Sequence, residues 1–230
     1  MVAFADTLFK ADFTLNAEGD GAIWVKQVED PSAFGVVKLN DGYITDFVEK
    51  PTEFVSDLAI IGIYFFKDGD KLSKEISYLI ENDLRPSGEF QLTDVLETLK
   101  KEGAKFLPGK VDVWMDCGKK DPTVDTNKKI LGFEHDKKNN LVADSVVLEN
   151  SKIIQPCYIG ENVILKNTTV GPYVSIGENS LVEDSKISNS LIQTNVTILN
   201  ASLENAMIGN HATYNGNFTS VSIGDYSELT

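Results

Sequence analysis

Hydrophobic residues in the second half of the chain recur at short, regular intervals. The segment IGENVI begins at Ile159, and related segments begin every 15 to 17 residues after it, at Ile176, Ile192, Ile208 and Ile223. Other aliphatic residues fall every five or six positions between these anchors. Such a short period, with one inward aliphatic residue per side, predicts a β-helix of stacked coils. Asparagine and glycine would form the corners, because both tolerate left-handed backbone angles.

The first half has the pattern of a mixed α/β domain. Runs rich in β-branched and aromatic residues predict strands at 23–28, 34–39, 44–49 and 58–66. Apolar residues at helical spacing predict a helix at 71–83. A second helix is predicted at 94–103, with Thr93 as its N-cap and Gly103 at its end. The N-terminal segment VAFADTLF has the composition of a strand that ends in Asp6.

A polar, charged stretch, HDKKNN, separates the two patterns. We therefore predict an α/β domain over residues 1–134, a linker over 135–142 and a β-helix over 143–230.

Composition narrows the classes of protein that the chain can belong to. Its 230 residues are 42% hydrophobic, enough for a substantial core. A net charge of −14 argues against a nucleic-acid-binding protein, which needs a basic face. The longest apolar run, 58–66, is too short to cross a membrane. Two cysteines give no disulfide framework, and the N-terminus has no secretory pattern, so we expect a cytoplasmic protein.

The stretch FVEKP places a carboxylate and an ammonium side by side where a strand ends. Glu49 and Lys50 follow an apolar run, and Pro51 comes next. A solvated strand end would account for both charges. A pocket for a ligand with hydroxyl groups at one end and a phosphate at the other would also account for them.

Five motifs occur in an order that resembles the sugar-1-phosphate nucleotidyltransferases. They are VEDPSAFGVV, FVEKP, AIIGIYFF, GEFQLTD and VWMDCG. With the repeats that follow, the chain is most similar to the glucose-1-phosphate thymidylyltransferase type with a left-handed β-helix tail. The resemblance implies the C-terminal part of a Rossmann-like mixed-sheet domain followed by a left-handed parallel β-helix.

The resemblance also implies a sugar-phosphate site. Glu49 matches a residue that accepts hydrogen bonds from sugar hydroxyls, and Lys50 matches one that meets the sugar phosphate and acts in catalysis. Gly35 and Ile60 match positions whose backbone faces the sugar. The implied substrate-binding set is Phe34, Gly35, Glu49, Lys50, Ile60, Gly62 and Tyr64.

Two carboxylates are implied to hold Mg²⁺ together with nucleotide phosphates. They are Asp6 and Asp116, which lie 110 residues apart, so only folding could bring them together. Their hard oxygen atoms suit Mg²⁺. Taken alone, Asp6 would be a strand-end residue and Asp116 a turn residue.

The implied reaction joins a sugar 1-phosphate to a nucleoside triphosphate and releases pyrophosphate, with glucose 1-phosphate and dTTP as the substrates nearest to the family type. A glycine-rich loop with a basic residue, which wraps the triphosphate in that family, does not occur in this sequence. We therefore expect a chain that lacks the N-terminal nucleotide-binding part and has little or no activity alone. We expect it to cover exposed strand edges by association, as a homo-oligomer, or by rearrangement. Ser87 stands where several relatives carry an arginine near the sugar phosphate; Arg85 lies two residues earlier.

Two other interpretations remain open. A non-catalytic subunit could bind a sugar phosphate or assemble a partner without chemistry. A hexapeptide-repeat acyltransferase would have similar coils, but it needs a general base, usually histidine. Here His135 falls in the predicted linker and His211 in a predicted corner of the β-helix.

Overall fold

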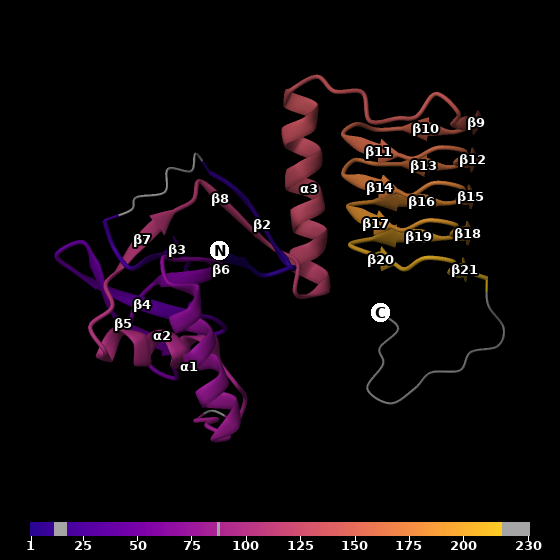
Figure 1. The fold of residues 1–230 in the computed structure, drawn as a ribbon. Helices are drawn as coiled ribbons and strands as arrows, with labels where there is room; N and C mark the ends of the chain where they lie inside the picture. The colour runs from indigo at the N-terminus through magenta and orange to yellow at the C-terminus, as the bar shows by residue number, and fades with distance from the viewer. Residues whose placement is uncertain (12–17, 87, 218–230) are drawn as a thin grey trace. The chain divides into compact units, whose positions relative to one another are not determined.

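The computed structural model describes residues 1–11, 18–86 and 88–217. Ser87 and the repeat that begins at Ile223 lie outside these residues. The chain forms two compact units, Met1–Asp116 and the part from Cys117 onward (Figure 1). Each unit is described separately below.

The first unit is built on a mixed sheet with the strand order β5-β4-β6-β3-β7, and β1 pairs with β6 off this path. The strands are β1 (Val2–Ala3), β3 (Gly21–Gln27), β4 (Gly35–Asn40), β5 (Tyr43–Glu49), β6 (Leu58–Phe66) and β7 (Phe106–Lys110). All pairs are antiparallel except β3 with β7. The four strands predicted from the sequence are confirmed as β3 to β6.

The N-terminal segment differs from the prediction of one strand ending in Asp6. It forms β1 and then β2 (Thr7–Lys10), which pairs with β8 (Val113–Asp116) instead of the main sheet. The break between β1 and β2 is a turn, in which the Phe4 N–H donates to the Gly62 carbonyl at 2.8 Å and the Thr7 N–H to the Phe4 carbonyl at 3.4 Å. Asp6 therefore lies in a turn between two strands and not at the end of one strand.

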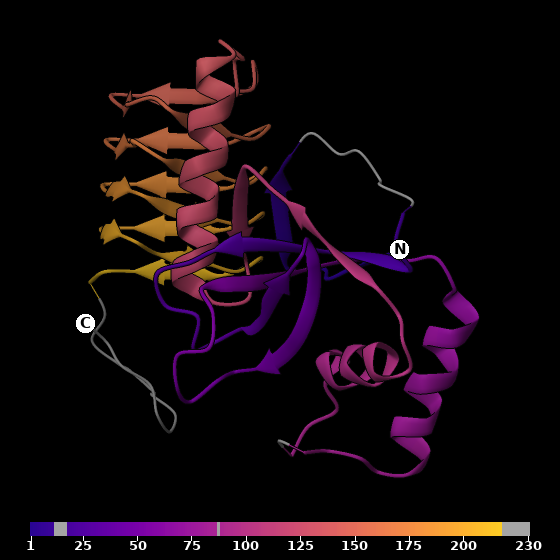
Figure 2. The same cartoon turned by 90° about the vertical axis from the view of Figure 1, so that its left-hand side faces the viewer.

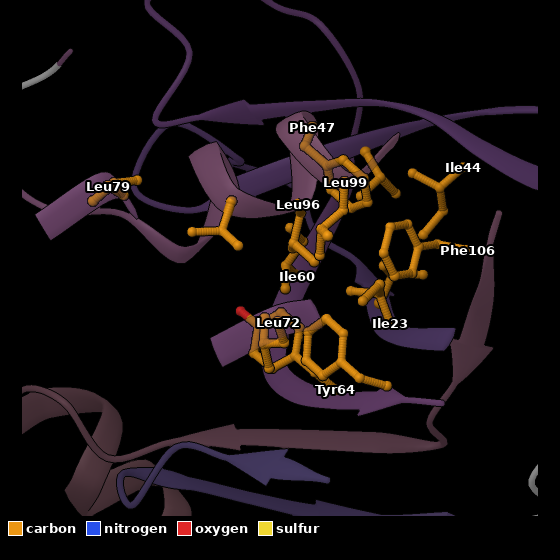
Figure 3. Packing of buried hydrophobic residues seen from close by; sticks show 14 residues of the cluster. Ile23, Ile44, Phe47, Ile60, Tyr64, Leu72, Leu79, Leu96, Leu99 and Phe106 are labelled. Carbon is orange, nitrogen blue, oxygen red and sulfur yellow. The ribbon is translucent and has the colours of Figure 1, made fainter. Parts of the chain in front are cut away.

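Two helices, α1 (Gly69–Glu81) and α2 (Leu92–Lys101), lie beside each other in both Figure 1 and Figure 2. Their apolar faces and one face of the sheet form a buried cluster, shown in Figure 3. Ile23, Phe47, Ile60 and Phe106 come from the strands, and Leu96 comes from α2. Burying this amphipathic stripe is what holds both helices to the sheet.

The other face of the sheet has its own core. Strand β6 alternates, so Ile60 faces the first cluster while Ile61 and Ile63 face the second, with Trp24 of β3. Phe9 of β2 and Trp114 of β8 pack against this second cluster. Strands β2 and β8 therefore cover the second face of the sheet.

The outer edge of β5 is partly satisfied by α2. Lys100 Nζ donates to the Thr45 carbonyl at 2.7 Å, and Glu97 Oε2 accepts the Phe47 N–H at 3.4 Å. These contacts use backbone groups that an open edge strand would offer to another chain. The homo-oligomer expected from exposed edges stays a prediction.

The second unit is a parallel β-helix, as the repeats predict. Its three sheets have the orders β21-β18-β15-β12-β9, β10-β13-β16-β19 and β11-β14-β17-β20, and every pair in them is parallel. The strands are β9 (Val147–Glu149), β10 (Lys152–Ile153), β11 (Cys157–Ile159), β12 (Ile164–Lys166), β13 (Thr169–Val170), β14 (Val174–Ile176), β15 (Leu181–Glu183), β16 (Lys186–Ser188), β17 (Ser190–Ile192), β18 (Thr197–Leu199), β19 (Ser202–Glu204), β20 (Met207–Ile208) and β21 (Thr213–Asn215). Ile159, Ile176, Ile192 and Ile208 stack in register, which is the predicted inward column.

Polar residues form the corners of the coils. Asn162, Asn179, Asn195 and His211 share one corner column, with φ values of 57°, 56°, 57° and 58°. Asn162 Nδ2 donates to Asn179 Oδ1 at 3.0 Å, so neighbouring corners are also bonded to each other. His211 is thus a corner residue, as predicted, which leaves the acyltransferase interpretation without support from this histidine.

A third helix, α3 (Lys120–Asp136), belongs to the second unit and runs along the stacked coils in Figures 1 and 2. Asn127 accepts a hydrogen bond of 2.6 Å from Ser175 of β14. The compact units therefore divide between Asp116 and Cys117, whereas the sequence predicts a linker at 135–142. Residues 135 and 136 end α3, and the domain limits as independently folding parts stay a prediction.

Candidate active site

One cavity of about 350 Å³ in the first unit collects the site residues predicted from the sequence. Nine of its lining residues are Asp6, Phe34, Gly35, Glu49, Lys50, Ile60, Gly62, Tyr64 and Asp116, the complete predicted set. They come from the turn before β2, the start of β4, the end of β5, the middle of β6 and the end of β8. Pairing between these strands therefore brings together groups that are far apart in the sequence, and their individual roles stay predictions.

Glu49 is held in one orientation by its surroundings. It lies opposite Gly35 in the β4–β5 register. Its Oε2 accepts a hydrogen bond of 2.5 Å from the hydroxyl of Thr93, in the first turn of α2. A Cβ atom at position 35 would lie 2.8 Å from the same oxygen, closer than a Cβ atom can approach. Glycine at this position therefore leaves the room that the Glu49 carboxylate occupies.

The charge of Glu49 is felt by two neighbouring groups. Burial raises the pKa of the Tyr64 hydroxyl above its usual range, and the negative charge of Glu49 adds to the effect. The pKa of Asp94 is also raised, first by burial and second by Glu49. Tyr64 is only 4% exposed, so its hydroxyl stays protonated beside the carboxylate. The cavity wall thus carries a negative group, Glu49, next to a neutral phenol.

Lys50 directly follows β5 and has a left-handed backbone conformation, with φ of 41°. Its N–H donates to the Phe34 carbonyl at 3.1 Å, which pins the backbone at the cavity. Its ammonium lies 3.8 Å from Glu89 Oε2 in a pair with both side chains more than half exposed. Lys50 and Glu49 are thus adjacent in sequence, but the ion pair that the described residues give Lys50 is with Glu89.

The backbone conformation and surroundings of Gly62 both favour glycine. Its φ of +78° lies in the region that disfavours other residues. A Cβ atom here would lie 2.8 Å from Cδ2 of Phe4, whose ring is 5.5 Å from that of Tyr64. The Phe4 side chain therefore lies directly against the backbone at Gly62.

The two residues predicted to bind metal are brought close together by strand pairing. Thr7 pairs directly with Asp116 across β2 and β8, and Asp6 precedes Thr7. Within residues 1–11, 18–86 and 88–217, no group of three or more His, Cys, Asp or Glu side chains could hold a metal ion. Two carboxylates fit Mg²⁺ by their chemistry, but water and phosphate oxygens would have to complete its six ligands.

The start of α2 also lines the cavity, which the sequence did not predict. Gln91, Leu92 and Thr93 lie in its wall, and Gln91 is the N-cap residue, without a side-chain bond to the helix. The N-terminal end of a helix carries partial positive charge from its N–H groups. The motif GEFQLTD was the available signal, because it places a polar residue on each side of Leu92 immediately before an amphipathic helix. The cavity therefore offers positive character from both Lys50 and α2.

The chain is similar in sequence to known nucleotidyltransferases. Residues 3–132 match the family described as "Nucleotidyl transferase", which is more than half of the chain. The chain is 28% identical to a glucose-1-phosphate thymidylyltransferase from Streptomyces griseus over 85% of its own length and 58% of the relative's. It is 30% identical to the low-salt glycan biosynthesis nucleotidyltransferase Agl11 from Haloferax volcanii over 74% of its own length and 51% of the relative's.

A third relative, the bifunctional protein GlmU from Methanocaldococcus jannaschii, is 29% identical over 94% of the chain and 56% of the relative. The chain thus spans about half the length of the curated relatives that it matches. The fold is that of an α/β nucleotidyltransferase unit joined to a parallel β-helix. The chain belongs to the nucleotidyl transferase family.

Proposed function

We propose that the cavity binds a sugar 1-phosphate, the acceptor substrate of a nucleotidyl transfer reaction. The observation that carries this proposal is the arrangement of Glu49, Lys50 and the start of α2 around one cavity. A carboxylate accepts hydrogen bonds from vicinal hydroxyls, whereas an ammonium and a helix N-terminus favour a phosphate. The cavity volume of about 350 Å³ is at the lower end of the range for small-molecule sites, which supports a ligand as small as a monosaccharide phosphate.

The sugar ring would lie against the β4 and β6 side of the cavity. Glu49 would accept bonds from two hydroxyls, and the backbone at Gly35 and Ile60 would face the ring, with Phe34 and Tyr64 in the wall. Lys50 would neutralise the phosphate at the other end. The neutral Tyr64 hydroxyl is an added donor or acceptor for the sugar, since its pKa is raised above its usual range by burial and by Glu49.

In the reaction, an oxygen of the sugar phosphate would attack the α-phosphorus of the nucleoside triphosphate, and pyrophosphate would leave. Lys50 would hold the attacking phosphate in place and offset its charge, so that positioning and electrostatics supply the rate. Mg²⁺, bound with the nucleotide, would neutralise charge on the phosphates. Asp6 and Asp116 would hold that ion, since they are neighbouring carboxylates in the wall of the same cavity.

The sugar we propose is glucose and the nucleotide dTTP, because the Streptomyces griseus relative is a glucose-1-phosphate thymidylyltransferase. The sequence contains no glycine-rich loop with a basic residue to wrap a triphosphate. We therefore propose that transfer requires a triphosphate-binding segment that this sequence does not supply. The same observation favours a second candidate, a non-catalytic subunit that binds the sugar phosphate without turning it over.

Calorimetric titration with glucose 1-phosphate, followed by dTTP and UTP, each with and without Mg²⁺, tests the proposal. We expect binding of glucose 1-phosphate, no binding of either triphosphate, and no release of pyrophosphate. Lys50→Ala should weaken the binding of glucose 1-phosphate by roughly tenfold or more, since a hydrogen bond to a charged group contributes about 1.5–3 kcal/mol. Lys38→Ala removes an exposed lysine outside the cavity and should change nothing. Equal affinity in wild type and Lys50→Ala would refute the assignment of the phosphate end.

Turnover separates the two candidate functions. Pyrophosphate release by this chain with any triphosphate would make it a complete enzyme and overturn the requirement for a further segment. Binding without turnover, which persists when a nucleotide-binding segment of a relative is added, would favour the non-catalytic subunit.

A further inference from the structure

Thr93 lies where the sequence predicts a helix cap, but it does not cap the helix. Gln91 is the N-cap of α2 and makes no side-chain cap bond. The Thr93 hydroxyl instead donates to Glu49 Oε2 at 2.5 Å, across 44 residues of sequence. A side-chain N-cap bond stabilises the start of a helix. The start of α2 goes without that contribution, while the threonine hydroxyl is used at the cavity.

The contact is partly buried and closely surrounded. Thr93 is 7% exposed, and its side chain lies in the wall of the cavity with Glu49 and Gly35. An ideal Cβ at Gly35 would lie 3.4 Å from Cγ2 of Thr93 and 2.8 Å from Oε2 of Glu49. The hydroxyl, the carboxylate and the glycine backbone are therefore in mutual contact, so Glu49 cannot turn without losing its bond to Thr93.

The bond uses only one oxygen of Glu49. Across the part of the chain that the structure describes, the hydrogen bond to this carboxylate comes from Thr93 and reaches Oε2. Glu49 lines the cavity, and among the described residues no hydrogen bond reaches its other oxygen, Oε1, which can still accept one. A carboxylate that is already oriented loses less freedom when it binds a ligand, which raises affinity without any new contact.

We propose that Thr93 is a positioning residue, which orients Glu49 to accept hydrogen bonds from the hydroxyls of a sugar phosphate. The proposal deepens the function proposed above and rests on it. Thr93 acts through Glu49 and not on the phosphate, so its removal should affect recognition of the sugar and spare recognition of the phosphate.

The test compares two ligands and three variants by calorimetry. Thr93→Val keeps the shape of the side chain and removes the donor, whereas Thr93→Ser keeps the donor. A hydrogen bond to a carboxylate changes a binding constant by roughly tenfold or more. Because Glu49 can partly recover its position without this bond, we expect Thr93→Val to bind glucose 1-phosphate about three- to tenfold more weakly than wild type. Inorganic phosphate should bind equally to wild type and to Thr93→Val. Thr93→Ser should have the wild-type affinity for glucose 1-phosphate.

Thr98→Val is the matched control. Thr98 lies on the same helix, and its hydroxyl bonds to the Asp94 carbonyl at 3.1 Å, away from Glu49. It should bind both ligands as wild type does. Equal weakening of both ligands by Thr93→Val, or a Thr93→Ser variant as weak as Thr93→Val, would overturn the proposal in favour of a purely structural role. If Thr93→Val does not fold, Thr93→Ala takes its place under the same criteria.

A readout without ligand separates this proposal from the proposed function. The ¹³C resonance of the Glu49 carboxyl should shift in Thr93→Val and stay in place in Thr98→Val. An unchanged resonance in Thr93→Val would overturn the positioning role. If the resonance shifts but the wild-type protein binds no glucose 1-phosphate, the proposed function is refuted. The proposal that the Thr93–Glu49 bond serves sugar recognition is then refuted as well.

Discussion

Gly35→Ala is expected to damage sugar recognition while leaving the fold intact. The new Cβ would lie 3.4 Å from both Ile60 Cδ1 and Thr93 Cγ2, which is tolerable, but 2.8 Å from Oε2 of Glu49. To restore an ordinary contact of 3.4 Å, the carboxylate must move by about 0.6 Å. Because this atom is the end of a flexible side chain, the displacement costs the backbone little.

The same displacement acts on the hydrogen bond of 2.5 Å from Thr93. Since a bond to a charged group is worth about 1.5 kcal/mol or more, we expect roughly tenfold weaker binding of glucose 1-phosphate. Replacing glycine by alanine also reduces the freedom of the unfolded chain, worth about 0.4–1 kcal/mol, which offsets the local strain. The melting temperature should therefore stay within roughly 4 °C of wild type.

Calorimetry with glucose 1-phosphate and inorganic phosphate, together with thermal unfolding, measures both effects. Gly132→Ala is the control, because a Cβ atom there meets nothing within 4 Å. It should leave binding unchanged. A folded Gly35→Ala variant that binds glucose 1-phosphate as tightly as wild type would refute the reasoning, since it would show that the position of the Glu49 carboxylate does not matter for the ligand.

Two further predictions concern ion pairs. Glu89→Gln removes the carboxylate that lies 3.8 Å from the Lys50 ammonium. Since exposed ion pairs contribute about 0.2–1 kcal/mol, phosphate ligands should bind up to roughly fivefold more tightly, and weaker binding in calorimetry would contradict this. The pKa of Asp121 is lowered by Lys120 first and by its hydrogen bond from Asn205 second, so its charged form stabilises the fold. That stabilisation is present above the ordinary value of 3.8 and is lost as pH falls through the lower folded pKa, so amide exchange in α3 should increase there in wild type but not in Asp121→Asn.

The β-helix is the part of the fold that the sequence predicts most directly. The five repeats share an inward isoleucine, and the first three also share a corner asparagine, so the copies of one pattern reinforce each other. The left-handed angles at Asn162, Asn179 and Asn195 follow from asparagine's tolerance of that conformation. His211 has the same angle, which shows that position in the repeat outweighs residue type at a corner.

The candidate site is less accessible from local pattern. The strands that carry Glu49 and Ile60 are readable from their composition, but the pairing of Thr7 with Asp116 joins segments separated by more than 100 residues. Cross-strand register of this kind is set by tertiary packing, which no local period reveals. Thr93 illustrates the same limit, because its position in the sequence predicts a helix cap, whereas in the structure its hydroxyl bonds to Glu49 at the end of β5.

The most direct test of the account is a map of where glucose 1-phosphate binds. Backbone amide resonances of the full chain should be followed by NMR during titration with glucose 1-phosphate, with inorganic phosphate as the comparison. We expect shifts at Gly35, Glu49, Lys50 and Gly62 with the sugar phosphate, shifts centred on Lys50 with phosphate alone, and unchanged coils in the β-helix. Shifts confined to the β-helix, or none at the cavity at saturating ligand, would contradict the proposed sugar-phosphate site.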